Sequence, residues 1–264
     1  MTRSASELPS EIKRFYDDRV FSPFFTDFLG FGEFLNFGYW EKGIEAPREA
    51  GTNLLMKLLN FIPEKKGAVL DVACGKGAST AILQRSYAPA KITGINISDR
   101  QLERCKVNAP GSTFLKMDAA ALEFENESFD AILCVEAAFH FNTRRRFFEE
   151  AHRVLKPGGR LVLSDVLMTR EAEKERERHV EENFVADPAE YESVLRSEGF
   201  DLVEVVDATR PCWHGYYWHW VEFFHQAYLE GRITLEQLKE NLQGNYQRVP
   251  ILSFYLLAWA EKKG

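Results

Sequence analysis

The sequence predicts an α/β fold in which a doubly wound parallel sheet carries helices on both faces. From Gly67 onward, short runs rich in β-branched and other apolar residues alternate with longer amphipathic runs. This alternation favours right-handed βαβ units, and therefore a parallel sheet. A chain of 264 residues is long enough to bury one such core together with a modest insertion.

The order of the runs predicts each element of the central region. Strands and their alternating helices are expected, in chain order, over residues 68–73, 78–87, 91–98, 99–109, 112–118 and 129–137. A helix over 143–155 with apolar residues at helical spacing then ends at a Pro-Gly-Gly stop and leads into a strand over 160–166. The mixed charge run over 170–182 predicts a solvated helix, because such runs usually face water.

Two further strands are expected near the end of the chain, over 199–209 and 251–263. The connection between them is too long for a tight turn, and a connection of that length usually carries its own structure. We therefore expect a helical insertion that covers the carboxyl edge of the sheet. Aromatic residues are densest over 15–40 and 213–228, two segments that flank the central region.

Composition narrows the class of protein. The formal charge of −7 opposes attraction to phosphate backbones, so a nucleic-acid partner is not expected. No apolar run approaches the roughly 18 residues that a membrane span requires, and no apolar stretch near the amino terminus is typical of a secretory signal. We expect a cytoplasmic protein with no membrane association, whose four separate cysteines are reduced core thiols.

The segment over 69–80, VLDVACGKGAST, carries the chemistry. It forms the first strand-to-helix turn, beside which open α/β sheets bind ligands, and Gly75 and Gly77 let the backbone approach a ligand closely. A dinucleotide fingerprint needs a third glycine at the position of Thr80, and a phosphate-binding P-loop needs a Gly-Lys-Ser/Thr sequence that this segment lacks. Both nucleotide alternatives are therefore disfavoured.

Five ordered motifs carry a resemblance. They are VLDVACGKGAST, GINIS, MDA, SFDAILCVEAAFHF and VLKPGGRLVLSD. Because the motifs occur in this order and spacing over residues 67–166, the chain resembles the class I S-adenosylmethionine-dependent methyltransferases. The GINIS segment followed by Gln101 resembles the small-molecule and lipid-type branches of that family, which include sugar, glycine-derivative, tocopherol and prenyl-diphosphate methyltransferases.

The resemblance implies a Rossmann-like, seven-stranded sheet with six parallel strands and one antiparallel strand. An N-terminal helical lid and a helical insertion before the last strand complete this fold. The implied organisation is a lid of aromatic helices over 1–60, an S-adenosylmethionine-binding core over 61–210, a helical aromatic cap over 211–248 and the last strand over 249–264.

The resemblance also implies a set of cofactor-binding residues. The acidic residue and the glycine loop would hold the methionine part and the sugar of S-adenosylmethionine, and a carboxylate and a helix amino end suit its ammonium and its carboxylate. The implied residues are Tyr39, Asp71, Ala73, Gly75, Gly77, Asn96, Ile97, Gln101, Asp118, Ala119, Val135 and Glu136.

Asn96 is a departure from the family pattern. The family usually has Asp or Glu at the end of the second strand, where a carboxylate accepts both ribose hydroxyls. An amide oxygen accepts one hydrogen bond and its NH₂ group donates another, so ribose binding is altered rather than excluded.

The acceptor side is predicted from aromatic and histidine residues. His140, just past the fourth strand, is the candidate catalytic base, because histidine titrates near neutral pH; ordering of the loop is the alternative role. The aromatic segment over 34–43 resembles rebeccamycin-type sugar methyltransferases, in which such rings cover the cofactor. The candidate substrate-binding residues are Tyr16, Trp40, His214, Tyr217 and Trp218. No metal is expected, because the histidines of the segment 211–228 lack companion ligands at metal spacing.

These features together predict transfer of a methyl group to O, N or C of a small organic metabolite. Two alternatives stay open: a C-methyltransferase acting on an isoprenoid or prenyl diphosphate, for which the aromatic rings would line the pocket, and an S-adenosylmethionine-binding protein that does not methylate. The expected partner is a small-molecule acceptor, and a homodimer is a candidate assembly.

Overall fold

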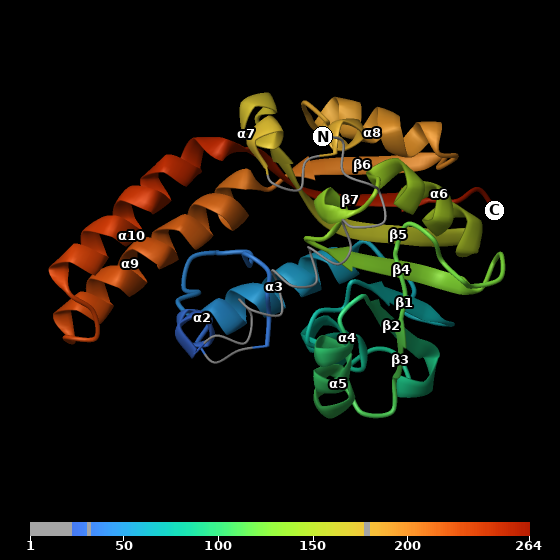
Figure 1. The fold of residues 1–264 in the computed structure, drawn as a ribbon. Coiled ribbons are helices and arrows are strands. Elements are labelled where there is room, and N and C mark those ends of the chain that lie inside the picture. Colours follow the sequence, from blue (N-terminus) through green and yellow to red (C-terminus); the bar gives the residue numbers. More distant parts are fainter. Residues whose placement is uncertain (1–22, 31–32, 177–179) are drawn as a thin grey trace.

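The fold was analysed in a computed structural model that describes residues 23–30, 33–176 and 180–264. Figure 1 shows a central sheet with helices on both sides. The strands are β1 (Val69–Val72), β2 (Ile92–Asn96), β3 (Thr113–Lys116), β4 (Phe129–Val135), β5 (Leu155–Met168), β6 (Leu202–Asp207) and β7 (Leu252–Glu261). The α-helices are α2 (Pro23–Phe28), α3 (Pro47–Asn60), α4 (Ala78–Leu83), α5 (Asp99–Asn108), α6 (Arg144–Val154), α7 (Arg170–Glu175), α8 (Pro188–Ser197), α9 (Gly215–Leu229) and α10 (Leu235–Arg248).

The seven strands form one sheet in the order β3-β2-β1-β4-β5-β7-β6. The pairs β1–β2, β1–β4, β2–β3 and β4–β5 are parallel, whereas β7 is antiparallel to both β5 and β6. Six strands therefore run one way and β7 runs the other. This confirms the predicted Rossmann-like sheet.

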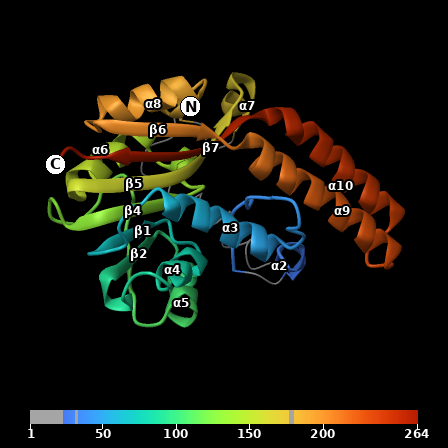
Figure 2. The same ribbon diagram turned by 180° about the vertical axis from the view of Figure 1, so that it is seen from behind.

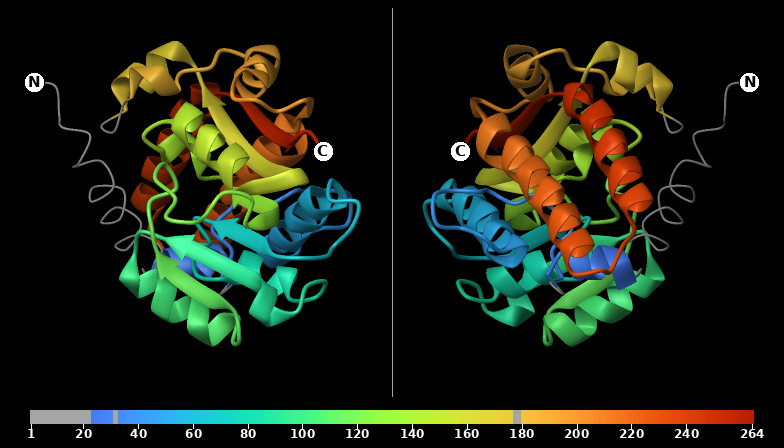
Figure 3. Two further views of the ribbon diagram at one scale, coloured as in Figure 1. Left: turned by 90° about the vertical axis from the view of Figure 1, so that its right-hand side faces the viewer. Right: turned by 90° about the vertical axis from the view of Figure 1, so that its left-hand side faces the viewer.

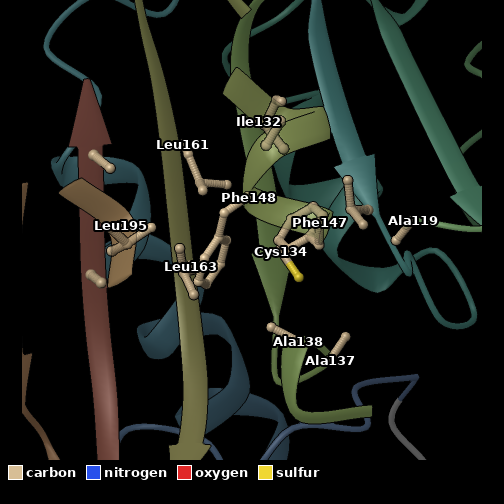
Figure 4. Close-up of a cluster of buried hydrophobic side chains, with 14 of the residues drawn as sticks. Ala119, Ile132, Cys134, Ala137, Ala138, Phe147, Phe148, Leu161, Leu163 and Leu195 are labelled. Carbon is tan, nitrogen blue, oxygen red and sulfur yellow. The ribbon is translucent and has the colours of Figure 1, made fainter. Parts of the chain in front are cut away.

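Alternate strand residues bury against different helices, as the pleat of a β-strand requires. On one face, Leu70, Ile132 and Leu163 pack against α6 and α8, whose Phe147, Phe148 and Leu195 complete this cluster (Figure 4). The residues that alternate with them along the strands pack against α3 and α4 in a second cluster. Figure 2 shows α3 running across the side of the sheet opposite to α6 and α8. The sheet is thus buried on both faces, which explains the nearly continuous apolar strands.

Helices α9 and α10 form a hairpin inserted between β6 and β7, as predicted. Figures 1 and 3 show it extending beyond the sheet toward α2 and the segment that follows it. Aromatic contacts join the two parts: Trp40 stacks on His219 with ring centroids 5.0 Å apart, and Phe28 contacts Tyr216 and Trp220. The described residues of the first aromatic-rich segment therefore pack on the second at one end of the sheet.

Two predicted elements differ in the structure. The solvated helix expected over 170–182 is wrong in extent, because α7 ends at Glu175 and a separate 3₁₀ turn covers Glu181–Asn183. Glu173 within α7 is buried rather than solvated. Its carboxylate forms an ion pair with the Arg176 guanidinium at 2.9 Å, which compensates for the loss of water. Strand β5 begins at Leu155 rather than after the Pro-Gly-Gly sequence, with a shift in its pairing to β4.

No helix among residues 23–30, 33–176 and 180–264 is long and apolar enough to cross a bilayer. All four cysteines are buried and free of disulfides, as predicted for core thiols. The sulfur atoms of Cys74 and Cys105 lie 3.7 Å apart, between the glycine loop and α5.

The start of α9 is a tight contact that can be tested. A Cβ atom added at Gly215 would lie 2.5 Å from Trp40 Cγ and Cδ1, so Gly215→Ala forces the indole ring to move. We expect a loss of about 1–3 kcal/mol in the free energy of unfolding, which is typical of overpacking. Gly244→Ala in α10 is the matched control, because nothing lies within 4 Å of its Cβ position and alanine favours a helix by about 0.5–1 kcal/mol. Urea unfolding measures the free energy of unfolding of both variants. Equal values for the two would contradict the tight contact between Gly215 and Trp40.

Candidate functional site

A cavity of about 530 Å³ lies at the carboxyl edge of the sheet. Its walls come from the ends of β1, β2 and β4, from the segment over 33–37 and from the hairpin. Ligands of open α/β sheets bind at this edge. Of the predicted site residues, the cavity is lined by Ala73, Gly75, Asn96, Ile97, Gln101, Asp118, Ala119, Val135, Glu136 and His140.

The glycine loop after β1 adopts a sequence of left-handed backbone conformations. Ala73, Gly75 and Gly77 have φ values of +55°, +55° and +88°. Gly77 lies just outside the cavity lining and caps the start of α4, where a Cβ atom would meet the Cys105 Cα at 2.9 Å. Glycine is required there by close packing on α5, whereas Gly75 leaves its side-chain space to the cavity.

Asp71 lies beneath the cavity rather than in its wall. Its Oδ2 accepts hydrogen bonds from the hydroxyls of Ser79 and Thr80 at 2.7 and 2.6 Å, and only 1% of the residue is exposed. Burial raises the pKa of Asp71 to about 6, against the effect of these two hydrogen bonds. The carboxyl group thus fixes the first turn of α4 to β1, which positions the glycine loop.

The end of β2 is organised by the Asn96 side chain. Its Oδ1 accepts a hydrogen bond from the Ser98 amide at 3.0 Å, and its Nδ2 donates to Gln101 Oε1 at 3.3 Å and to the Gly75 carbonyl at 3.4 Å. The amide therefore links the second strand to the glycine loop, and it still lines the cavity. Asp118 lines the neighbouring part, with Oδ1 accepting from the Ala120 amide.

Sequence reasoning missed a charged cluster at this end of the cavity. Lys76 is 4% exposed and forms an ion pair with Glu33 at 2.9 Å, and Glu33 is also paired with Arg104. Burial alone would raise the pKa of Glu33, but hydrogen bonds from Lys76 and Arg104 outweigh it and lower the pKa. Nearby, the buried Oδ1 of Asn36 lines the cavity and has no hydrogen-bond partner among the described residues.

Glu136 follows β4 directly and connects three parts of the site. Its φ of +49° is unusual for a non-glycine residue, and such strained conformations gather at functional sites. Oε1 accepts hydrogen bonds from the Phe37 amide at 2.7 Å and from the Tyr255 hydroxyl. Burial raises the pKa of Glu136 to about 8, although these hydrogen bonds act in the opposite direction. A protonatable carboxyl group therefore stands in the cavity wall.

His140 stands beside Arg176, a residue that the sequence analysis assigned to a solvated helix. The distance from Arg176 Nη2 to His140 Nδ1 is 3.5 Å, and Arg176 also lines the cavity. A guanidinium only donates hydrogen bonds, so this contact is compatible with the tautomer in which Nδ1 accepts and the ring proton is on Nε2. In this tautomer Nε2 is a hydrogen-bond donor.

The aromatic wall of the cavity is formed by Trp213, Tyr216 and Trp220, which follow one face of η4 (Arg210–His214) and α9 at spacings of three and four residues. All three belong to the aromatic segment over 211–228 whose rings are candidates for the wall of an acceptor pocket, although the residues selected from that segment as substrate-binding are His214, Tyr217 and Trp218. Their rings pack on each other and on Phe37 and Phe28.

The aromatic and histidine residues that were predicted here do not line the cavity. His214 and Trp218 are exposed, the latter by 64%, and Tyr217 contacts Trp218 and Tyr246 instead. Trp40 and Tyr39 lie behind the wall: Trp40 stacks on His219 and the Tyr39 ring contacts Lys57 Nζ. Tyr16 lies outside the described residues.

Metal-binding side chains do not gather in the described part of the chain, where no group of three or more His, Cys, Asp or Glu residues is arranged to hold an ion.

Comparison with known proteins identifies the scaffold. The model of a methyltransferase domain matches residues 70–163. The chain is 34% identical over 224 residues to 27-O-demethylrifamycin SV methyltransferase of Amycolatopsis mediterranei, an alignment that covers 78% of this chain and 80% of that protein. It is 30% identical over 212 residues to O-methyltransferase cnsE of Penicillium expansum, covering 75% of each.

Among solved structures, the [4+2]-cyclase SpnF superposes with a TM-score of 0.75 at 21% identity over 97% of both chains, a likeness of fold. The motifs, the sheet order and the relative matched over 80% of its length agree, and the chain belongs to the family of small-molecule S-adenosylmethionine-dependent methyltransferases.

Proposed function

We propose that this protein transfers the methyl group of S-adenosylmethionine to an oxygen atom of a small, ring-containing metabolite. The observation that carries the proposal is that one continuous cavity extends from the glycine loop past Glu136 and His140 to the aromatic residues of η4 and α9. Two relatives with high coverage support oxygen as the acceptor atom, since both names refer to O-methylation or to an O-demethyl substrate.

The glycine-loop end of the cavity fits the cofactor. Gly75 leaves room for a ligand, and the unpartnered Oδ1 of Asn36 suits a ligand ammonium group. Ile97, Asp118 and Ala119 would surround the adenine part. When bound, S-adenosylmethionine supplies an electrophilic methyl group on a positively charged sulfur atom.

The acceptor is proposed to bind between His140 and the aromatic wall. The face of Trp213, Tyr216 and Trp220 gives an apolar surface for a ring, and aromatic side chains near a sulfonium also stabilise its charge. Methyl transfer needs mainly alignment and exclusion of water. His140 is proposed to contact the acceptor oxygen, either as the base or, in the tautomer described above, as a donor that orients it.

Substitution of His140 separates these roles. If Nε2–H orients the acceptor, His140→Gln, whose amide can donate, retains more activity than His140→Ala. If the ring is the base, both variants lose about 10²–10⁴-fold in kcat and the rate of each becomes dependent on hydroxide. The pH profile of kcat for the three proteins is the measurement, and equal activity of all three would remove His140 from the reaction.

Two experiments test the function itself. Calorimetry with S-adenosylmethionine and S-adenosylhomocysteine measures cofactor binding, and incubation with methyl-labelled cofactor and panels of phenols, alcohols, amines and prenyl diphosphates identifies the acceptor class. Labelling of a hydroxyl compound supports the proposal. Labelling of a prenyl diphosphate carbon favours the isoprenoid alternative, and tight cofactor binding with no labelled product favours a protein that does not methylate. Absence of cofactor binding rejects all three.

A further inference from the structure

Two residues of the cavity wall that the α9–α10 hairpin forms carry buried polar groups without partners among the described residues. Asn245 is 7% exposed, and its Nδ2 has no hydrogen-bond partner among the described residues. The indole Nε1 of Trp220 is also buried and has no hydrogen-bond partner among the described residues. Both residues line the cavity. Buried donors are normally paired, so two unpaired donors in one wall point to a ligand group that accepts hydrogen bonds.

A positive charge stands beside these donors. Arg248 also lines the cavity and is exposed, so it lies at the opening. Asn245 and Arg248 are three residues apart on α10 and therefore share one face of that helix. Trp220 is the last residue of the aromatic wall on α9, which packs along α10.

This part of the wall holds no opposing charge. The lining residues from η4, α9 and α10 are Trp213, Tyr216, Trp220, Asn245 and Arg248, and none of them is acidic. The carboxyl groups in the cavity wall come from other elements: Glu33 lies between α2 and α3, and Asp118 and Glu136 follow the ends of β3 and β4. The hairpin thus offers hydrogen-bond donors and one cation next to an apolar surface.

We propose that the methyl acceptor carries an anionic oxygen group, such as a carboxylate, remote from the methylated atom, and that Trp220, Asn245 and Arg248 bind this group. The ring of the acceptor lies against Trp213 and Tyr216, which directs its other end toward His140 and Glu136. Charge-assisted hydrogen bonds are the strong ones, and an arginine at the opening also attracts an acidic ligand. This inference rests on the proposed function, since it describes the acceptor of that reaction.

The test uses two fluorescent probes of similar shape, one anionic and one neutral. 1-Anilinonaphthalene-8-sulfonate carries an anionic oxygen group on a ring system, and N-phenyl-1-naphthylamine is its neutral counterpart. Both are titrated into protein saturated with S-adenosylhomocysteine, so that the acceptor end remains for the probe. We expect Arg248→Gln to weaken binding of the sulfonate about tenfold and to leave the neutral probe within about twofold, as for loss of one charge-assisted hydrogen bond.

Two further variants complete the design. Asn245→Leu keeps the branched shape and the number of side-chain heavy atoms but removes the donor, and it should also weaken binding of the sulfonate selectively. Lys239→Gln makes the same change of charge at an exposed site on α10 that does not line the cavity, and it should alter neither probe. The inference would be overturned if Arg248→Gln and Lys239→Gln changed binding of the sulfonate equally, or if Arg248→Gln weakened both probes equally. In that case the donors of Asn245 and Trp220 would bind water rather than an acceptor.

Calorimetry with S-adenosylhomocysteine on the same samples distinguishes failure of the proposed function from failure of the anionic-acceptor inference. Failure of S-adenosylhomocysteine to bind the wild-type protein rejects the proposed function. Normal binding of S-adenosylhomocysteine combined with no discrimination between the probes rejects only the anionic acceptor.

Discussion

Replacement of Arg144 by methionine is expected to destabilise the protein by about 3–5 kcal/mol, the range found when one partner of a buried ion pair is removed. The side chains of Arg144 and Asp165 are 4% and 0% exposed, and Arg144 Nε lies 2.7 Å from Asp165 Oδ2. The guanidinium also donates to the carbonyls of Val166 and Asn183. Loss of the arginine would leave the Asp165 charge buried with the Tyr191 hydroxyl and two backbone amides as its remaining partners.

The neighbouring residue provides the control. Arg145 pairs with Glu198 at 2.9 Å, but its side chain is 51% exposed, and surface pairs contribute about 0–1 kcal/mol. Urea unfolding of Arg144→Met and Arg145→Met at pH 7 compares a buried with an exposed pair one residue apart. Equal midpoints for the two variants would show that the ion pair of Arg144 with Asp165 contributes no more than the exposed pair.

The second large effect concerns Glu136 and the cofactor. Burial raises the pKa of this carboxyl group to about 8, and a sulfonium in the same cavity would favour the carboxylate. Binding of S-adenosylmethionine should therefore release a proton near neutral pH. Its affinity should rise by up to about tenfold per pH unit below pH 8 and level off above it. Binding of S-adenosylhomocysteine, which has a neutral sulfur atom, should change little. Calorimetry in two buffers with different ionisation enthalpies counts the protons released.

Glu136→Gln keeps an acceptor for the Phe37 amide and removes the titrating group. The variant should bind S-adenosylmethionine with little dependence on pH. Its stability should also differ: the folded chain holds the Glu136 proton more tightly than the unfolded chain, where the pKa is near its ordinary 4.5. The stability that this proton contributes is complete below pH 4.5 and is lost as pH rises toward 8. The variant should therefore unfold at higher temperature than wild type at pH 9, and an unchanged pH dependence would exclude Glu136 as its source.

The sequence was most informative where local chemistry decides the structure. Alternating apolar runs predicted the order of strands and helices, and the glycine loop predicted the position of the cavity beside β1, because left-handed turns need particular residues. Asp71 was different: its residue type suited a ligand ammonium, but Ser79 and Thr80 occupy its Oδ2 atom. Hydrogen-bond partners within the fold cannot be assigned from residue type alone.

The acceptor end shows two separate reasons for failure. For the aromatic wall, the helical period helps only in part. Trp213, Tyr216 and Trp220 are three and four residues apart, which places Trp218 off their face, but Tyr217 lies four residues from Trp213 and three from Trp220, so the period alone does not separate Tyr217 from the wall. For Arg176 and Arg248, no such signal exists. Charged residues in a polar helix look solvated, and only the tertiary arrangement turns them toward the cavity.

The insertion of the hairpin between β6 and β7 has a consequence for how this protein can change over evolutionary time. The residues proposed to bind the cofactor come from strands at one side of the sheet, whereas the aromatic wall and its donors come from a single continuous stretch over residues 210–248. The strands on either side of that stretch pair with each other, so the ends of the hairpin are fixed whatever its sequence. Under the proposed function, substitutions within this one contiguous segment are enough to reshape the aromatic wall, and the residues proposed to bind the cofactor all lie outside it.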